Sequence, residues 1–73
     1  MKEYKVLLTW DNEASVWIAT SDDIPGLILE SGSADALIER VRHAVPELLE
    51  LNNQNPKDAG LSFNTDYHAK VYA

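Results

Sequence analysis

The side chains in this sequence that could take part in catalysis are mainly carboxylates. The first possibility to consider is that several of them bind a metal ion together. The candidates are Asp22, Asp23, Glu30, Glu39 and Asp66. Two-metal phosphoryl transfer requires several carboxylates that converge on ions about 4 Å apart. These five lie in separate segments, which favours solvated surface carboxylates, so we expect no metal site. The run Asp11-Asn12-Glu13 lacks the glycine and the twelfth-position glutamate of a calcium loop and indicates a turn.

The two histidines are the other candidates for catalysis. His43 follows Glu39 by four residues on the polar face of a predicted helix, and His68 lies on the polar face of a predicted strand. The sequence has no cysteine and no serine in an elbow motif, so a histidine base would have no nucleophile to activate. We expect solvated or ion-paired histidines, with an interface role as the alternative, and a protein that is not an enzyme and needs no cofactor.

One long helix from Ser33 to Asn53 must organise the rest of the chain. Its apolar residues recur at spacings of three and four and form one stripe: Ala34, Leu37, Ile38, Val41, Ala44, Val45, Leu48 and Leu49. Ser33 is a suitable N-cap, and Asn52 or Asn53 suits the left-handed C-terminal position. Pro46 predicts a kink, because the apolar phase continues across it, and the alternative is the start of a second short helix.

The remaining apolar segments predict strands. Tyr4 to Trp10 alternates, Val16 to Thr20 is β-branched and aromatic, Leu27 to Ser31 is short, and Leu61 to Tyr72 alternates again. In the last strand we assign one set to the core: Leu61, Phe63, Thr65, Tyr67, Ala69 and Val71. The order β-β-β-α-β predicts an α+β fold in which one helix covers one face of a four-stranded sheet, and residues 1–73 form one domain.

The uncovered face of this sheet is a candidate contact surface. Trp17, or Val16 together with Ile18, must point away from the helix, and Leu7 and Tyr72 could extend the same patch. The alternative is a set of isolated exposed apolar residues, which any protein carries. Likewise, the loop from Asp22 to Gly26 either contacts a partner or only forms the turn that its residue types favour.

Composition narrows the class of partner. The chain has 73 residues, a formal net charge of −6 and only six scattered Lys and Arg residues, which argues against direct nucleic-acid binding and favours a basic protein partner. A core this small, without disulfides, makes a dimer or higher homo-oligomer an expected source of stability. No apolar run has the length of a membrane span and the N-terminus is not a signal peptide, so we expect a cytoplasmic protein.

Two long motifs resemble a known family. They are Trp10-Asp11-x-Glu13-Ala14-x-Val16-Trp17-x-Ala19-x-Ser21-Asp22-Asp23-Ile24-Pro25-Gly26-Leu27 and the helix end Val45-Pro46-Glu47-Leu48-Leu49-x-Leu51-Asn52. Together with the intervening residues they are similar, over about residues 3 to 72, to a small bacterial family of unknown function that is grouped with the HicB-type antitoxins.

This resemblance implies a partial RNase H-like fold with strand order 3-2-1-4 and a domain that binds and silences HicA, a small basic ribonuclease toxin. RNase H-like nucleases carry an acid within the first strand, and this chain has none there before Asp11. Many HicB proteins continue into a DNA-binding segment, whereas this sequence stops at Ala73, so we do not expect autorepression through DNA.

We therefore predict a non-enzymatic interaction domain that covers a basic ribonuclease. The alternatives are an orphan oligomeric module and a vestigial metal-dependent nuclease. The residues predicted at the partner or oligomer interface are Trp10, Trp17, Asp22, Asp23, Ile24, Pro25, His68 and Tyr72.

Overall fold

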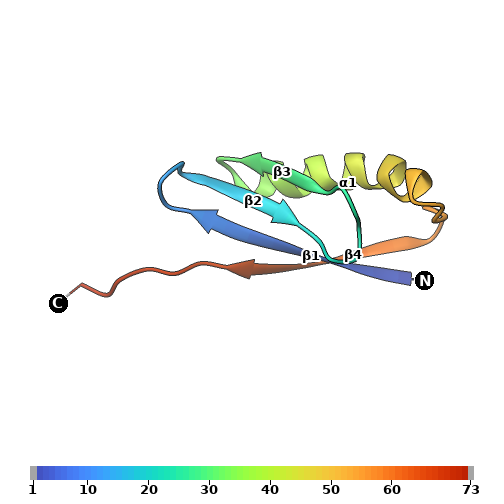
Figure 1. The fold of residues 1–73 in the computed structure, drawn as a ribbon. Coiled ribbons are helices and arrows are strands. Elements are labelled where there is room, and N and C mark those ends of the chain that lie inside the picture. The colour runs from blue at the N-terminus through green and yellow to red at the C-terminus, as the bar shows by residue number, and fades with distance from the viewer. Residues whose placement is uncertain (1, 73) are drawn as a thin grey trace.

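The computed structural model describes residues 2–72 and contains four strands and one helix (Figure 1). They are, in chain order, β1 (Lys2–Asp11), β2 (Val16–Thr20), β3 (Ile28–Ser31), α1 (Ala34–Leu51) and β4 (Ala59–Asp66). The predicted element order and the α+β class are confirmed. Within residues 2–72, no helix combines the length and the apolar character that crossing a bilayer requires.

The strands form one mixed sheet in the order β3-β2-β1-β4. β1 pairs antiparallel with β2, β2 pairs antiparallel with β3, and β4 returns parallel to β1 after the helix. This strand order is the one that the resemblance implied. It leaves β3 and β4 at the two edges of the sheet.

The helix is bounded by the expected residues. The Ser33 side chain accepts a hydrogen bond from the backbone N–H of Ala36, which satisfies one of the unpaired donors at the helix start. Asn52 is the C-cap, and Asn53 follows with a positive φ of 59°. α1 continues through Pro46 as one helix, so the alternative of a second helix is wrong.

The core lies between the sheet and α1. Tyr4, Val6 and Leu8 of β1 and Ala19 of β2 meet Leu37, Val41, Val45 and Leu49 of the helix, and all eight are buried. Two further buried residues, Ile24 and Leu27, come from the loop between β2 and β3. Ile24 is therefore a core residue, and its assignment to a contact surface was wrong, because a side chain without exposed area cannot touch a partner.

The last strand differs most from its prediction. β4 begins two residues earlier than expected, at Ala59, and ends at Asp66 instead of Tyr72. β1 pairs with β4 as far as Thr9 opposite Asp66 and ends at Asp11, so residues 67–72 have no neighbouring strand within the described chain. Tyr67, Ala69 and Val71 are consequently exposed, and so is Thr65 near the end of β4; the assignment of these four residues to the core was wrong.

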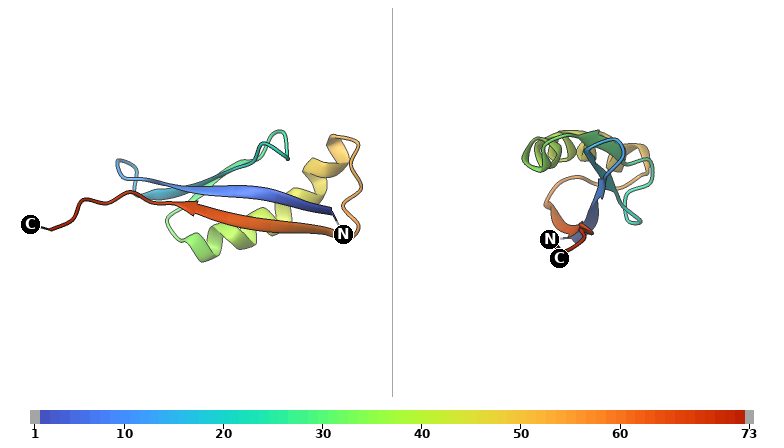
Figure 2. Two further views of the ribbon diagram at one scale, coloured as in Figure 1. Left: turned by 90° about the horizontal axis from the view of Figure 1, so that it is seen from below. Right: turned by 90° about the vertical axis from the view of Figure 1, so that its left-hand side faces the viewer.

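The helix does not cover the sheet evenly. α1 packs mainly against β2 and β3, and the right-hand view of Figure 2 shows β4 at the edge of the sheet, away from the helix. Leu61 and Phe63 of β4 are only half-buried as a result. The molecule is elongated, with extents of 50 × 20 × 18 Å, because residues 67–72 run on from β4 beyond the sheet (Figure 1).

Candidate interaction surfaces

The face of the sheet opposite α1 carries an apolar centre, which we call the open face. The β1 register pairs Leu7 with Thr20 and Thr9 with Ile18, and β3 places Ile28 beside Thr20. Because paired residues share a face, Leu7, Ile18 and Ile28 all point away from the helix. Ile28 is 71% exposed. Of the two alternatives for the second strand, Val16 with Ile18 is the outward set, and Trp17 lies on the helix side.

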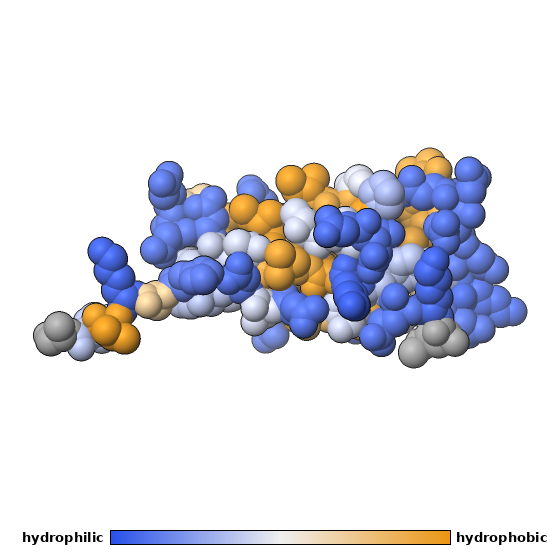
Figure 3. All heavy atoms as spheres, turned by 60° about the horizontal axis from the view of Figure 1, so that its bottom comes forward, coloured by the Kyte–Doolittle hydropathy of each residue, from blue (hydrophilic) through white to orange (hydrophobic). Residues whose placement is uncertain are grey.

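Carboxylates border the open face. Asp11 lies opposite Val16, Glu30 lies opposite Ile18, and Asp66 lies opposite Thr9. Hydrophobic and hydrophilic side chains are accordingly interspersed over the strands in Figure 3. Lys5 lies on the same face, two residues before Leu7, so the border is acidic except at that position. An apolar centre with a mainly acidic border suits a partner that presents apolar side chains among basic ones.

The loop after β2 is fixed to this face by backbone hydrogen bonds. The Asp23 carboxylate accepts from the backbone N–H of Lys5 at 2.8 Å, and the Ser21 hydroxyl donates to the Lys5 carbonyl. The backbone N–H of Asp23 donates to the same hydroxyl at 3.0 Å. A shallow hollow of about 220 Å³ lies beside this loop, with Lys5, Leu7, Thr20, Asp22 and Asn64 among its lining residues. The two alternatives for this loop are therefore compatible: Asp23 orders the turn, and Asp22 remains exposed.

The two tryptophans lie together on the helix side of the sheet. Trp10 pairs with Trp17 across β1 and β2, and their ring centroids are 5.4 Å apart in an edge-to-face arrangement. Tyr67 completes an aromatic cluster, with its ring 5.9 Å from Trp10 and 5.7 Å from Trp17. Both tryptophans are half-buried, whereas Tyr67 is 56% exposed. Tyr67 was missed as a surface residue because its place in the alternation assigned it to the core.

The other predicted site residues lie apart from one another. His68 approaches Asp66, with 2.7 Å between Nε2 and Oδ1, on a solvated surface. Tyr72 is exposed in the segment beyond β4, and the carbonyl of Pro25 accepts a hydrogen bond from the Asn52 side chain at 3.1 Å. The loop of Asp22, Asp23 and Pro25 is attached near Lys5, which lies about 17 Å along β1 from Trp10. The structure thus divides the predicted residues between the two ends of the sheet.

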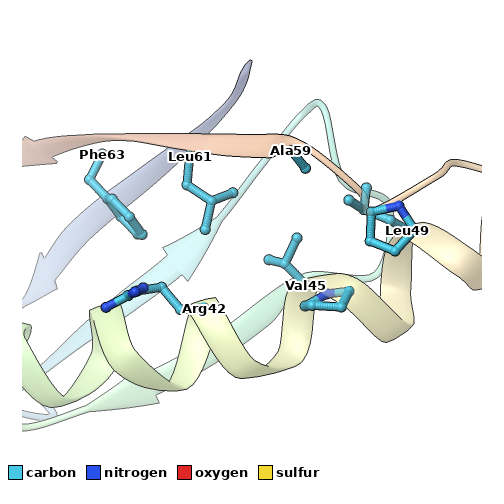
Figure 4. Close-up of a pocket in the computed structure, with 8 residues that line it drawn as sticks. Arg42, Val45, Leu49, Ala59, Leu61 and Phe63 are labelled. Carbon is cyan, nitrogen blue, oxygen red and sulfur yellow. The ribbon is translucent and has the colours of Figure 1, made fainter. Parts of the chain in front are cut away.

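A groove between α1 and β4 was not predicted from the sequence. It has a volume of about 270 Å³, and in Figure 4 Leu61 and Phe63 point from β4 toward the helix while Val45 points from the helix toward β4. Its other lining residues are Arg42, Pro46, Leu49, Pro56 and Ala59. The groove exists because α1 lies over β2 and β3 and leaves β4 partly uncovered. The periodicity of the sequence does not indicate over which strands the helix lies.

Within residues 2–72, no group of three or more histidine, aspartate or glutamate side chains gathers where it could hold a metal ion.

The model of a family described as a domain of unknown function, DUF1902, matches residues 3–73. The chain belongs to this family. This DUF1902 chain is similar to the hypothetical protein TTHA1013 from the extremely thermophilic bacterium Thermus thermophilus. The crystal structure of that protein matches with a TM-score of 0.81 and 36% sequence identity, covering 96% of this chain and 100% of that chain. No curated protein matches the chain significantly. The expectation of a small family of unknown function is confirmed.

Proposed function

We propose that this DUF1902 chain is a non-enzymatic, HicB-like interaction domain of the cytoplasm with a partial RNase H-like fold. It binds a small basic HicA-type ribonuclease and neutralises it by occlusion, without direct contact to nucleic acid. The observation that carries this proposal is the open face, where Leu7, Ile18 and Ile28 lie exposed or half-exposed within a border of carboxylates. The resemblance of the two sequence motifs to the HicB group supplies the class of partner.

The net charge of −6 should attract a basic partner before the two proteins touch. Asp11, Glu30 and Asp66 attract a basic RNA-binding surface and steer it onto the open face, which raises the rate of encounter. Apolar contact then holds the complex, because the centre of the face loses its water. Since the steering acts between solvated charges, affinity should fall as salt is raised.

The test begins with the reading frames adjacent to the gene. A short frame that encodes a basic protein should arrest growth when expressed alone, and co-expression of this chain should restore growth. The purified pair should form a complex in which RNA cleavage is inhibited. The absence of such a frame, or a basic neighbour that does not bind, would contradict the antitoxin proposal. An unrelated basic protein, such as cytochrome c, should not bind, and if it does, charge alone explains the affinity.

Two matched variants locate the contact. Ile28→Lys places a cation on the open face at its β3 edge, whereas Ala36→Lys makes an apolar-to-cation change at an exposed position near the start of α1. Because Ile28 is 71% exposed and Ala36 is exposed, neither change costs the core anything. Ile28→Lys should weaken toxin binding by tenfold or more, on the order of one lost apolar anchor, and Ala36→Lys should leave it unchanged. Equal effects would place the contact elsewhere.

Two alternatives remain as proposals of lower rank. An orphan oligomeric module without a toxin is favoured by the outer edge of β4, which no strand within residues 2–72 pairs with. A vestigial nuclease would bind Mg²⁺ or Mn²⁺, and titration calorimetry with either ion would detect the heat of binding.

A further inference from the structure

The two edges of the sheet are protected to different degrees. β3 is only four residues long, and the Arg40 side chain donates a hydrogen bond to the backbone carbonyl of Glu30 in that strand. β4 is eight residues long, and no strand within residues 2–72 pairs with its outer side. Between Ala59 and Asp66 it holds no proline and no lysine, the residues that usually prevent an edge from pairing. β4 is therefore available to a further strand.

The segment after β4 keeps the pattern of a strand without having a neighbour. Tyr67, Ala69 and Val71 continue the alternation of Leu61, Phe63 and Thr65. Tyr67 packs on the two tryptophans of its own chain but stays 56% exposed, and Ala69 and Val71 are exposed as well. Figures 1 and 3 show this segment, residues 67–72, projecting from the body of the molecule. An apolar alternation that the chain itself does not bury is typical of a segment that another chain covers.

The groove supplies the matching surface. Its β4 side is formed by Ala59, Leu61 and Phe63, at the beginning of the strand, whereas residues 67–72 leave from the end of the strand. The segment therefore cannot reach the groove of its own chain while β4 is paired with β1. A second copy that runs antiparallel along the outer edge of β4 brings its residues 67–72 beside the groove, and a parallel copy takes them away from it.

We propose that two copies of this chain pair antiparallel through β4, each closing the groove of the other with residues 67–72. The register that fits best places Asn64 opposite Asn64 of the second copy. Tyr67 then lies opposite Leu61, Ala69 lies opposite Ala59, and Lys70 lies opposite Asp58. The first two pairs bring apolar side chains to the apolar groove, and the third places the Lys70 ammonium opposite the Asp58 carboxylate. The two sheets become one eight-stranded sheet with both helices on the same face.

This inference specifies the homo-oligomer that the small core led us to expect, and it does not depend on a toxin. The groove and β4 edge lie apart from the centre of the open face. The dimer is tested with the chain alone, so a failure of either experiment leaves the other result intact.

Single-cysteine variants test the register, because the sequence contains no cysteine. Residues directly opposite in an antiparallel pair have Cα atoms about 4.5–5.5 Å apart, within the range of a disulfide, so Asn64→Cys should oxidise to a covalent dimer. Ser62→Cys is the matched control on the same face of the same strand. In this register its two thiols lie about 14 Å apart, so it should stay monomeric on a denaturing gel.

Sedimentation of the unmodified chain and two substituted variants tests the contact itself. The chain should be dimeric at about 100 μM, and Tyr67→Ser should weaken the dimer about tenfold because it removes the ring from the groove. Leu51→Ser removes an exposed apolar side chain from α1, outside the groove, and should have no effect. A monomer at this concentration, a dimer insensitive to Tyr67→Ser, or no selective cross-link at Asn64→Cys would each overturn the proposal. Circular dichroism confirms that each variant is folded.

Discussion

Leu49 and Leu51 lie two positions apart in α1, and the helical turn gives them opposite environments. Leu49 is 1% exposed and contacts the core, whereas Leu51 is 72% exposed. The same contrast separates Ile24, which packs in the core, from its neighbour Pro25, which is exposed. At the scale of single residues, burial therefore decides which substitutions change stability and which leave surface free for a partner.

Leu49→Ala should lower the free energy of unfolding by about 2–5 kcal/mol, because it removes buried methyl groups and leaves a cavity. Leu51→Ala, the same change in the same region of the helix, should alter it by less than about 0.5 kcal/mol. Urea denaturation followed by circular dichroism measures both. Should Leu49→Ala fail to fold, Leu49→Met keeps the volume and should cost under about 1.5 kcal/mol. Similar losses at both leucines would contradict the observed core.

Gly26→Ala should be destabilising because Gly26 has a φ of +89°, in the left-handed region. The new Cβ would meet Cδ2 of Leu48 at 3.4 Å, an ordinary contact, so the expected loss of about 1–2 kcal/mol comes from the backbone conformation. Gly32→Ala is the control, since Gly32 has no such φ and its Cβ would meet only the Ser15 carbonyl at 3.9 Å. Thermal unfolding distinguishes the two, and equal melting temperatures would mean that the turn at Gly26 has another conformation.

At the scale of elements, the position of α1 over the sheet determines which surfaces remain. The helix covers β2 and β3 and leaves β4 half-covered, which opens the groove lined by Val45, Leu61 and Phe63. Within residues 2–72, no helix covers the opposite face. One helix on a four-stranded sheet thus creates two different surfaces, an apolar face bordered by acids and a groove beside a free edge.

Pro46→Ala should stabilise the helix. Pro46 lies inside α1 and has no N–H to donate to the carbonyl of Arg42, whereas alanine restores this hydrogen bond. We expect a gain of about 1–3 kcal/mol in the free energy of unfolding, measured by urea denaturation. Glu47→Ala, at the next and equally exposed position, is the control and should change stability by less than about 0.5 kcal/mol. A loss of stability on Pro46→Ala would show that its ring packing in the groove outweighs the missing bond.

At the scale of the whole molecule, small size and net charge set the limits. A chain of 73 residues is expected to have about 4–11 kcal/mol of stability, so a single core substitution consumes much of it. A net charge of −6 adds repulsion within the chain, and it is the reason that we propose a basic partner. Pairing through β4 would compensate for both the small core and the incompletely covered edge.

The melting temperature should rise with protein concentration, because a dimer is stabilised by mass action. A tenfold increase in concentration should raise it by about 3–5 °C, and calorimetry over two decades of concentration measures this slope. The Tyr67→Ser variant should show a flatter slope than the unmodified chain. A melting temperature that is independent of concentration would indicate a monomer.

The helix and the first hairpin could be predicted from the sequence because their signals are local. The apolar stripe, the Ser33 cap and the alternation from Tyr4 to Leu8 are read from neighbouring residues, and α1 and β1 bury most of the apolar residues among them. These features depend on steric and hydrogen-bonding rules that act over a few residues.

Only the tertiary structure decided where the last strand ends, which tyrosine joins the tryptophans and where the groove lies. The alternation through Val71 is the same whether or not a neighbouring strand exists, and β1 ends at Asp11. Likewise, the apolar stripe on α1 indicates that this side of the helix must be buried, but it does not indicate which strands bury it. Pairing and offset depend on residues far apart in the chain, so the local pattern determined the elements and packing determined the surfaces they leave exposed.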